Sequence, residues 1–267
     1  MEAISDVYGL AGKRALACGS TQGIGRACAN QFARLGAAVT LIARNEAALK
    51  RVCAELPGGS DRKHDFICAD FDDPEGLQRK VAESLKRNGP AHVLLNNSGG
   101  PPHGPILQAK PADFEAAFRR HVICNQLLVA AVLPGMKQTG YGRIINIIST
   151  SVKEPISGLG VSNTTRWAVA AWAKTTAGEL APLGITVNNI LPGYTDTARL
   201  HELIKAKAEA SASNEDAVRQ AMIARIPMGR LATPEEIAAA AGFLASPAAS
   251  YVTGINLPVD GGRTGSL

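Results

Sequence analysis

The architecture of this chain follows from the stretch Ala17-Cys18-Gly19-Ser20-Thr21-Gln22-Gly23-Ile24-Gly25-Arg26. An apolar run over 14–18 leads into its glycines, and a helical pattern over 26–35 leads out of them. Glycines between a strand and a helix let the backbone turn tightly and approach a pyrophosphate, while the helix N-terminus offers free N–H groups and partial positive charge. The stretch therefore predicts a dinucleotide site, with a plain tight turn as the alternative.

Strand and helix patterns alternate along the rest of the chain. Further strands are expected over 37–43, 64–69, 92–95, 143–148, 185–191 and 255–259. Helices are expected between them, over 46–56, 74–87, 111–138 (interrupted near Pro134-Gly135), 164–180 and 234–244. Such alternation implies right-handed crossovers and a parallel sheet with helices on both faces. The predicted fold class is therefore α/β, a Rossmann-type doubly wound parallel sheet in a single domain, 1–267, with a helical flap at about 195–224.

Composition excludes several classes of function. A hydrophobic share of 46% supports a sizeable core. The net charge of +5 comes with 4% aromatic residues and no basic run, so we expect no nucleic-acid partner. Neither a signal-peptide pattern nor an apolar stretch long enough to span a bilayer is evident, which predicts a soluble cytoplasmic protein without a membrane partner. The cysteines lack metal-ligand or disulfide spacing, so we expect no metal and free thiols at Cys18, Cys28, Cys53, Cys68 and Cys124.

The loops at the carboxyl ends of the predicted strands are the expected place for a ligand, as in other open parallel sheets. These loops are 19–25, 43–44, 70–71, 97–100, 149–151 and 192–197. Function concentrates on loops that a rigid scaffold positions. We therefore expect the binding site at this edge of the sheet.

Several short motifs, each present once, follow one another along the chain. They are Gly19-x-x-x-Gly23-Ile24-Gly25, Asn96-Asn97-Ser98-Gly99, Gly142-Arg-Ile-Ile-Asn-Ile-Ile-Ser149, Pro192-Gly193 and Val259-Asp-Gly-Gly262. With these motifs the chain resembles a short-chain dehydrogenase/reductase, most of all the bacterial 3-oxoacyl-acyl-carrier-protein reductases, over nearly its whole length. The resemblance implies seven strands, a nicotinamide cofactor, a small carbonyl or acyl substrate, and a homotetramer or homodimer.

The resemblance also implies which residues hold the cofactor. They are Gly19, Ser20, Thr21, Gln22, Gly23, Ile24, Gly25, Arg44, Asp70, Phe71, Asn97, Ser98, Gly99, Pro192, Gly193, Thr195 and Thr197. NAD-dependent relatives end the second strand with an acidic residue, whereas this chain has Ala43 followed by Arg44. A guanidinium pairs with a 2′-phosphate that an acid would repel, so NADP(H) is favoured over NADH. A solvent-exposed arginine is the alternative, and Gln22 stands where NADP-type relatives often have a second basic residue.

The catalytic positions depart from the family pattern. The family carries a serine, a tyrosine thirteen residues later, a lysine four beyond it, and often an asparagine in the preceding helix. Those positions are Ser149, Ser162, Arg166 and His121 here. A general acid of matched pKa contributes roughly 10²–10⁴-fold to the rate. A serine hydroxyl is too weakly acidic to replace tyrosine, and arginine keeps its proton, although a guanidinium can stabilise an oxyanion.

Other side chains are candidates for the proton donor. The imidazole of His121 titrates in a suitable range, with a buried structural histidine as the alternative. Tyr194 is a second candidate, with packing as the alternative; Lys153 and His103 are expected on loops at the rim of the cleft. Ser149 is the best candidate to bind a substrate oxygen. The predicted function is NADP(H)-dependent reduction of a carbonyl, such as a 3-oxoacyl thioester or ketone, by an altered set of catalytic residues. The alternative is a catalytically impaired nucleotide-binding or assembly subunit.

Overall fold

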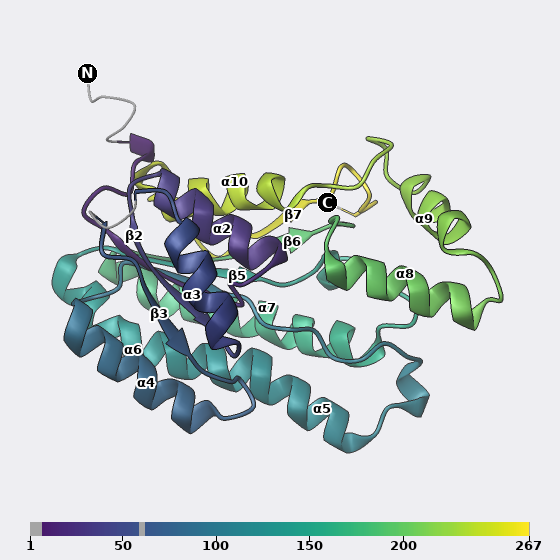
Figure 1. Ribbon diagram of the computed structural model, residues 1–267, viewed down its shortest axis with the longest axis horizontal. Helices are drawn as coiled ribbons and strands as arrows, with labels where there is room; N and C mark the ends of the chain where they lie inside the picture. Colours follow the sequence, from purple (N-terminus) through teal and green to yellow (C-terminus); the bar gives the residue numbers. More distant parts are fainter. Residues whose placement is uncertain (1–6, 59–61, 267) are drawn as a thin grey trace.

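Seven strands form one parallel sheet in the computed structural model, which describes residues 7–58 and 62–266 (Figure 1). Residues 1–6, 59–61 and 267 of the predicted domain lie outside the described part. The strands are β1 (Arg14–Cys18), β2 (Ala38–Ala43), β3 (Asp65–Cys68), β4 (Val93–Asn96), β5 (Gly142–Ile147), β6 (Ile185–Pro192) and β7 (Asn256–Val259). Their order is β3-β2-β1-β4-β5-β6-β7, and every neighbouring pair is parallel. The direction of winding reverses between β1 and β4, which confirms the doubly wound sheet and defines a switch point where ligands bind.

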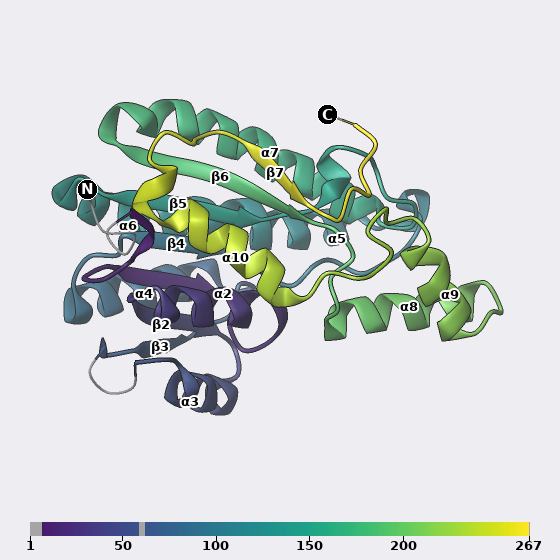
Figure 2. The ribbon, with the colours of Figure 1, turned by 90° about the horizontal axis from the view of Figure 1, so that it is seen from above.

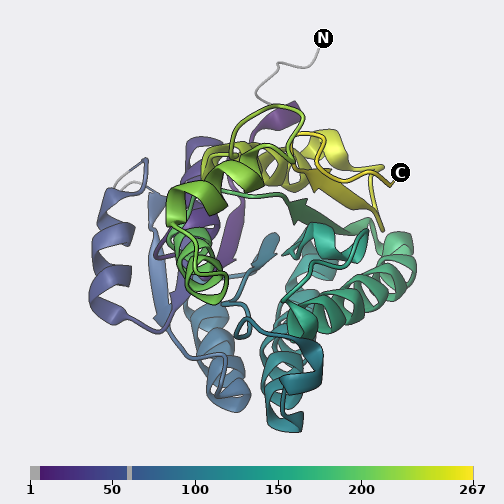
Figure 3. The same ribbon diagram turned by 90° about the vertical axis from the view of Figure 1, so that its right-hand side faces the viewer.

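Helices cover both faces of this sheet, as Figures 1 and 3 show. On one face, α2 (Gly23–Arg34), α3 (Glu46–Glu55) and α10 (Pro234–Ala245) share an apolar core with the strands. On the other, α4 (Pro74–Asn88), α6 (Cys124–Thr139) and α7 (Gly160–Leu180) share a second core. Side chains alternate between faces along each strand, so Ile144 of β5 joins the second core and Ile145 the first. This burial on both faces explains why the strands are apolar runs rather than alternating patterns.

The long helical stretch after β4 is irregular at a different place from the one predicted. Helix α5 (Pro111–Phe118) continues through a π-helical turn, Arg119–Ile123, directly into α6. The interruption expected near Pro134-Gly135 is wrong, because Pro134 lies inside α6. Proline in a helix interior costs about 3 kcal/mol or more, but Val132 and Met136 on either side of it are buried in the core. The packing of these two side chains against the core stabilises a helix that continues without a break across Pro134.

This same stretch, Pro111–Thr139, is long and apolar enough to cross a membrane by length and composition alone, with a mean hydropathy of 1.2. The sequence-based expectation that no stretch is apolar enough to span a bilayer is therefore wrong as a statement about composition and length. In the fold, 44% of its most apolar window is buried. Because Leu128, Val132 and Met136 belong to the core beneath the sheet, the stretch is a core helix of this fold.

Two helices extend from one end of the molecule between β6 and α10 (Figures 1 and 2). They are α8 (Ala198–Ala210) and α9 (Glu215–Ile223), and they make up the predicted flap. Leu200, Leu203 and Ile204 of α8 pack against Met222 and neighbouring apolar side chains. Amphipathic packing thus accounts for most of the apolar residues of the flap.

All five cysteines are free thiols, as predicted. Cys18, Cys28 and Cys124 are buried, and burial raises the pKa of each to about 12. A protonated, buried thiol is a poor nucleophile. Within residues 7–58 and 62–266, no group of three or more His, Cys, Asp or Glu side chains is placed to hold a metal ion.

Candidate active site

The turn between β1 and α2 has no room for a side chain at its first and last glycine positions, Gly19 and Gly25. Gly19 has a φ of +59° and Gly23 a φ of +53°, a conformation that favours glycine. A Cβ at Gly19 would lie 2.6 Å from the backbone oxygen of Asn97, and a Cβ at Gly25 would lie 2.2 Å from that of Gly19. Gln22 precedes α2 without a side-chain cap, so the first N–H groups of the helix are not used by the cap residue. This turn fits the pyrophosphate of a dinucleotide.

A cavity of about 800 Å³ opens beside the glycine turn, between the loops at the carboxyl ends of the strands and the flap. Most of the predicted site residues line it. They are Gly19, Thr21, Gln22, Gly23, Ile24, Arg44, Asp70, Phe71, Asn97, Ser98, Gly99, Ser149, Ser162, Arg166, Pro192, Gly193, Thr195 and Thr197. Residues from six separate loops therefore meet at one site, as the parallel sheet predicts.

Three predicted residues, Ser20, Gly25 and His121, do not line this cavity. Ser20 is fully buried, and its hydroxyl accepts a hydrogen bond from the backbone N–H of Ile42 at 3.1 Å. The assignment of Ser20 as a cofactor contact is therefore corrected: its side chain ties the glycine turn to β2. Gly25 does not line the cavity; its lack of a side chain allows α2 to pack closely against the backbone of Gly19.

One end of the cavity fits the adenosine part of a phosphorylated dinucleotide. Arg44 follows β2, is exposed and lines the cavity. In the part of the chain that the structure describes, Arg44 has no carboxylate within 4 Å, whereas nearby Arg120 pairs with Asp72 at 2.6 Å. Asp70 and Phe71 follow β3 beside it. A free guanidinium in place of an acid suits a 2′-phosphate.

Ser149, Ser162 and Arg166 also line this cavity, and the part that they line is called the reaction end. The Ser149 hydroxyl oxygen accepts the N–H of Ser151 at 3.0 Å, which leaves its own hydrogen for another acceptor. Helix α7 begins at Gly160, four residues before the predicted start, so Ser162 lies in its first turn. Ser162 and Arg166 are four residues apart and share one face of the helix.

Arg166 is a cation without a carboxylate partner among the described residues. Its Nη1 donates to the backbone oxygen of Ile147 at 3.1 Å, and the side chain lines the cavity. Burial lowers its pKa to about 10, and the charge of Arg199 acts in the same direction. Arg166 therefore stays protonated at neutral pH and carries an uncompensated positive charge into the site.

His121 lies behind the wall of the site, in the π-helical turn. It is 2% exposed, and its Nδ1 is 2.8 Å from the Ser98 hydroxyl oxygen. Its Nε2 has no hydrogen-bond partner among the described residues. Burial first, and then the charges of Arg166 and Arg120, lower the pKa of His121 well below its usual value. The imidazole is thus neutral at pH 7; it does not line the cavity itself but contacts the Ser98 side chain and the Gly99 backbone, and both residues do.

Two basic residues of this site, Arg199 and His103, are absent from the predicted catalytic and cofactor-binding residues, although His103 was expected at the rim of the cleft. Arg199, in the first turn of α8, lines the cavity and donates to the backbone oxygen of Pro101 at 2.6 Å. His103 also lines it. A basic residue two positions after Thr197 was the available signal for Arg199, but only the folded flap places it over the loop after β4. Tyr194 lines the cavity and packs in the flap core, with Arg263 4.7 Å from its ring centre.

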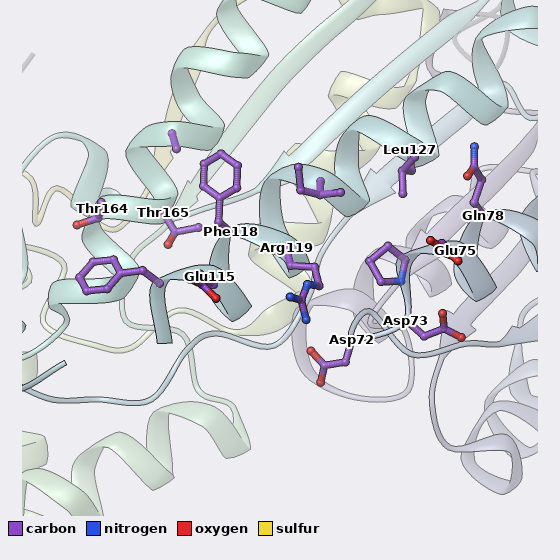
Figure 4. A pocket seen from close by; sticks show the side chains of 14 residues that line it. Asp72, Asp73, Glu75, Gln78, Glu115, Phe118, Arg119, Leu127, Thr164 and Thr165 are labelled. Carbon is purple, nitrogen blue, oxygen red and sulfur yellow. The ribbon is translucent and has the colours of Figure 1, made fainter. Parts of the chain in front are cut away.

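A second hollow, of about 1040 Å³, lies over α4, α5 and α7 (Figure 4). Asp72, Asp73 and Glu75 lie along one side of it, and Phe118 and Thr165 at the other end. None of the predicted catalytic or cofactor residues lines it. We therefore place the active site in the smaller cavity, where the glycine turn, Ser149 and Arg166 meet.

Known proteins share both the sequence pattern and the fold. The family described as enoyl-(acyl carrier protein) reductase matches residues 19–264. The chain belongs to the short-chain dehydrogenase/reductase family. It is 31% identical over 258 residues to the 3-oxoacyl-[acyl-carrier-protein] reductase FabG of Pseudomonas aeruginosa. The aligned region covers 95% of this chain and 98% of that reductase.

Solved structures of this family are similar over almost the full length. The L-sorbose reductase of Gluconobacter frateurii, complexed with NADPH and L-sorbose, has a TM-score of 0.91 at 31% identity and covers 97% of this chain and 99% of its own. YwfH, an NADPH-dependent reductase involved in bacilysin biosynthesis, has a TM-score of 0.87 at 28% identity, covering 96% and 99%. The chain is thus a short-chain oxidoreductase with NADPH-using reductases among its structural neighbours.

Proposed function

We propose that this protein uses NADPH to reduce the carbonyl group of a small molecule, such as a 3-oxoacyl thioester or a ketone, with an altered set of catalytic residues. One observation carries the proposal. The hydroxyl of Ser149 and the unpaired guanidinium of Arg166 line the same cavity as the glycine turn. A hydrogen-bond donor and a cation beside a dinucleotide site are what a developing alkoxide requires.

The residues present fit a phosphorylated nicotinamide cofactor. The glycine turn and the first N–H groups of α2 would hold the pyrophosphate, and Arg44 the 2′-phosphate. Asn97 and Thr195 would line the nicotinamide ribose, as the resemblance implies. When bound, the cofactor supplies the hydride. The free guanidinium of Arg44 favours NADPH over NADH.

Two residues stabilise the negative charge that develops on the substrate oxygen. Ser149 donates its hydroxyl hydrogen to that oxygen, and Arg166 adds a full positive charge. Because Arg166 is partly desolvated, its charge acts more strongly than it would in water. Loss of one such oxyanion donor typically costs about 10²–10³ in kcat.

The proton that completes the alcohol has a different source from that of typical relatives. Arg166 keeps its proton near pH 7, since its pKa is about 10. His121 is neutral and does not itself line the cavity. We therefore assign the final protonation to solvent in the open cavity, after Ser149 and Arg166 have shared the charge. The expected consequence is slower turnover than with a tyrosine acid.

The proposal is tested by steady-state oxidation of NADPH with a panel of ketones and 3-oxoacyl thioesters. Turnover above the enzyme-free rate with at least one compound is the expected result. The matched variant is Ser162→Tyr with Arg166→Lys. If no compound is reduced by the natural chain and activity arises only in this double variant, the protein is the impaired nucleotide-binding subunit instead.

We further propose a homotetramer or homodimer in the cytoplasm, without nucleic-acid or membrane partners. The resemblance implies pairing through long helices and the C-terminal strand. The exposed side chains of Phe118 and Ile123 on the long helical stretch, and the position of β7 at the sheet edge, support this. Light scattering after size-exclusion chromatography tests the oligomer; a monomer at micromolar concentration would contradict it.

A further inference from the structure

One end of the active-site cavity gathers positive charge that the proposed reaction does not use. The loop after β4 and the start of α8 meet there: the Arg199 guanidinium donates to the Pro101 backbone oxygen and lies against Gly100. His103 lines the same part of the cavity. The loop is fixed on its other side, because the N–H of Gly104 donates to the backbone oxygen of Gly158 at 2.8 Å.

The positive charge there is only partly balanced. The charges of Arg166 and Arg199 are close enough that Arg199 lowers the pKa of Arg166. Burial lowers the pKa of Arg199 itself. Its one carboxylate neighbour within 4 Å in the described chain is Glu202, at 3.8 Å and 70% exposed. An exposed pair of that kind contributes little, so the two guanidiniums remain short of negative charge.

His103 is a second polar side chain at this end of the cavity whose hydrogen-bonding capacity is not used within the chain. Both of its ring nitrogens are shielded from solvent, and neither has a hydrogen-bond partner among the described residues. Buried polar atoms are nearly always bonded. Burial, with Arg199 and Lys207, lowers the pKa of His103, while Glu202 acts in the opposite direction. The ring is neutral at pH 7 and has one N–H to donate.

We infer that Arg199 and His103 form a subsite for an anionic group of the substrate, so that the substrate is a carbonyl compound bearing a carboxylate. This inference rests on the proposed function, because it assigns a substrate class to the same cavity. The carboxylate accepts from the Arg199 guanidinium and, after a rotation of the His103 ring that brings its shielded N–H to the cavity, from His103, while the reacting carbonyl lies at Ser149 and Arg166. Ile156, Leu159 and Leu203 give this part of the cavity apolar walls. They suit an apolar body between or beside the two polar groups.

The test compares an acid with its own ester, which removes only the charge. The probes are 2-oxo-4-phenylbutanoate and its ethyl ester, titrated by calorimetry into the protein saturated with NADP⁺, which has no hydride to transfer, so that the heat reports binding alone. Wild type is expected to bind the acid at least about 10-fold more tightly, the effect of a hydrogen bond to a charged group. In Arg199→Gln this preference is expected to vanish with the ester affinity unchanged. Arg199→Lys is expected to keep part of it.

Lys205→Gln is the matched control, since it removes the same charge from an exposed position on the same helix outside the cavity lining. Equal binding of acid and ester by wild type, no binding of the acid, or equal losses in Arg199→Gln and Lys205→Gln overturns the inference. NADPH is titrated first. Normal NADPH binding in Arg199→Gln shows that this variant is folded. Failure of wild type to bind NADPH overturns the proposed function as well, whereas failure of the acid alone overturns only the subsite.

Discussion

The two ends of the active-site cavity differ in how tightly the fold determines them. At the nucleotide end the backbone itself makes the site: a Cβ on Gly19 or Gly25 would collide with neighbouring backbone oxygen. At the reaction end the site is made by side chains, and Ser162 and Arg166 occupy the positions that the resemblance assigns to tyrosine and lysine. Backbone geometry can persist while the chemistry beside it changes. The nucleotide end therefore indicates what is bound, and only the reaction end indicates what is done with it.

The largest expected effect is at the reaction end. Arg166→Gln removes the cation but keeps a polar side chain of similar reach. We expect kcat/KM to fall by about 10²–10³, as for loss of one oxyanion-stabilising group, with NADPH affinity unchanged. Steady-state kinetics together with NADPH titration measure both. An equal loss of NADPH affinity would instead assign Arg166 to cofactor binding, and the contrast between the two ends would weaken.

A smaller effect is expected when the nucleotide end is changed. Gly25→Ala places a Cβ 2.2 Å from the backbone oxygen of Gly19, so the turn must shift. Overpacking of this kind costs about 1–3 kcal/mol, which corresponds to NADPH binding weaker by about 10–100-fold if the distortion falls on the bound form. Gly178→Ala is the control, since a Cβ there, in the last turn of α7, would meet nothing within 4 Å. Unchanged NADPH affinity in Gly25→Ala would contradict the packing argument.

Arg44→Gln tests whether the nucleotide end distinguishes NADPH from NADH. A charge-assisted hydrogen bond contributes about 1.5–3 kcal/mol, so we expect the preference for NADPH over NADH to fall by about 10-fold or more. The affinity for NADH should stay the same, because the proposed partner of Arg44 is the 2′-phosphate, which NADH lacks. Fluorescence titration with both nucleotides measures this. An equal loss of affinity for NADPH and NADH would show that Arg44 does not recognise the 2′-phosphate.

The smallest expected effect concerns His121 and the pH dependence of stability. Its pKa is lowered in the folded state, so the unfolded chain binds the proton more readily. Stability is therefore lost as pH falls below the unfolded value of about 6.5. His121→Asn should reduce that loss by up to about 1.4 kcal/mol per pH unit. Denaturant unfolding between pH 5 and pH 7 tests this, with the exposed His201→Asn as control; identical slopes for wild type and His121→Asn would contradict it.

Much of the fold could be predicted because its signals are local. The glycine stretch and the apolar runs place all seven strands within a few residues of their observed bounds. The helical irregularity could not be placed, because Pro134 looks like a break while Val132 and Met136 pack well enough to carry the helix past it. The π-helical turn at Arg119–Ile123 has no comparable signal in the sequence.

The site residues that directly follow a strand could be predicted from the sequence. The residues whose position depends on packing between distant segments could not. The loops after the strands line the cavity as expected. Ser20 was assigned to the cofactor because nothing in the sequence shows that its hydroxyl faces β2. Arg199 was missed because only the folding of α8 over the loop after β4 brings it to Pro101. Contacts between segments distant in sequence are the part that local patterns do not contain.

The most direct measurement for the central claim is calorimetric titration of the purified protein with NADPH and, separately, with NADH. The claim is that the cavity beside the glycine turn holds a phosphorylated nicotinamide nucleotide. It predicts one saturable site for NADPH and binding of NADH weaker by about 10-fold or more, the contribution of the Arg44 pairing. No heat of binding with either nucleotide at millimolar concentration would contradict the account.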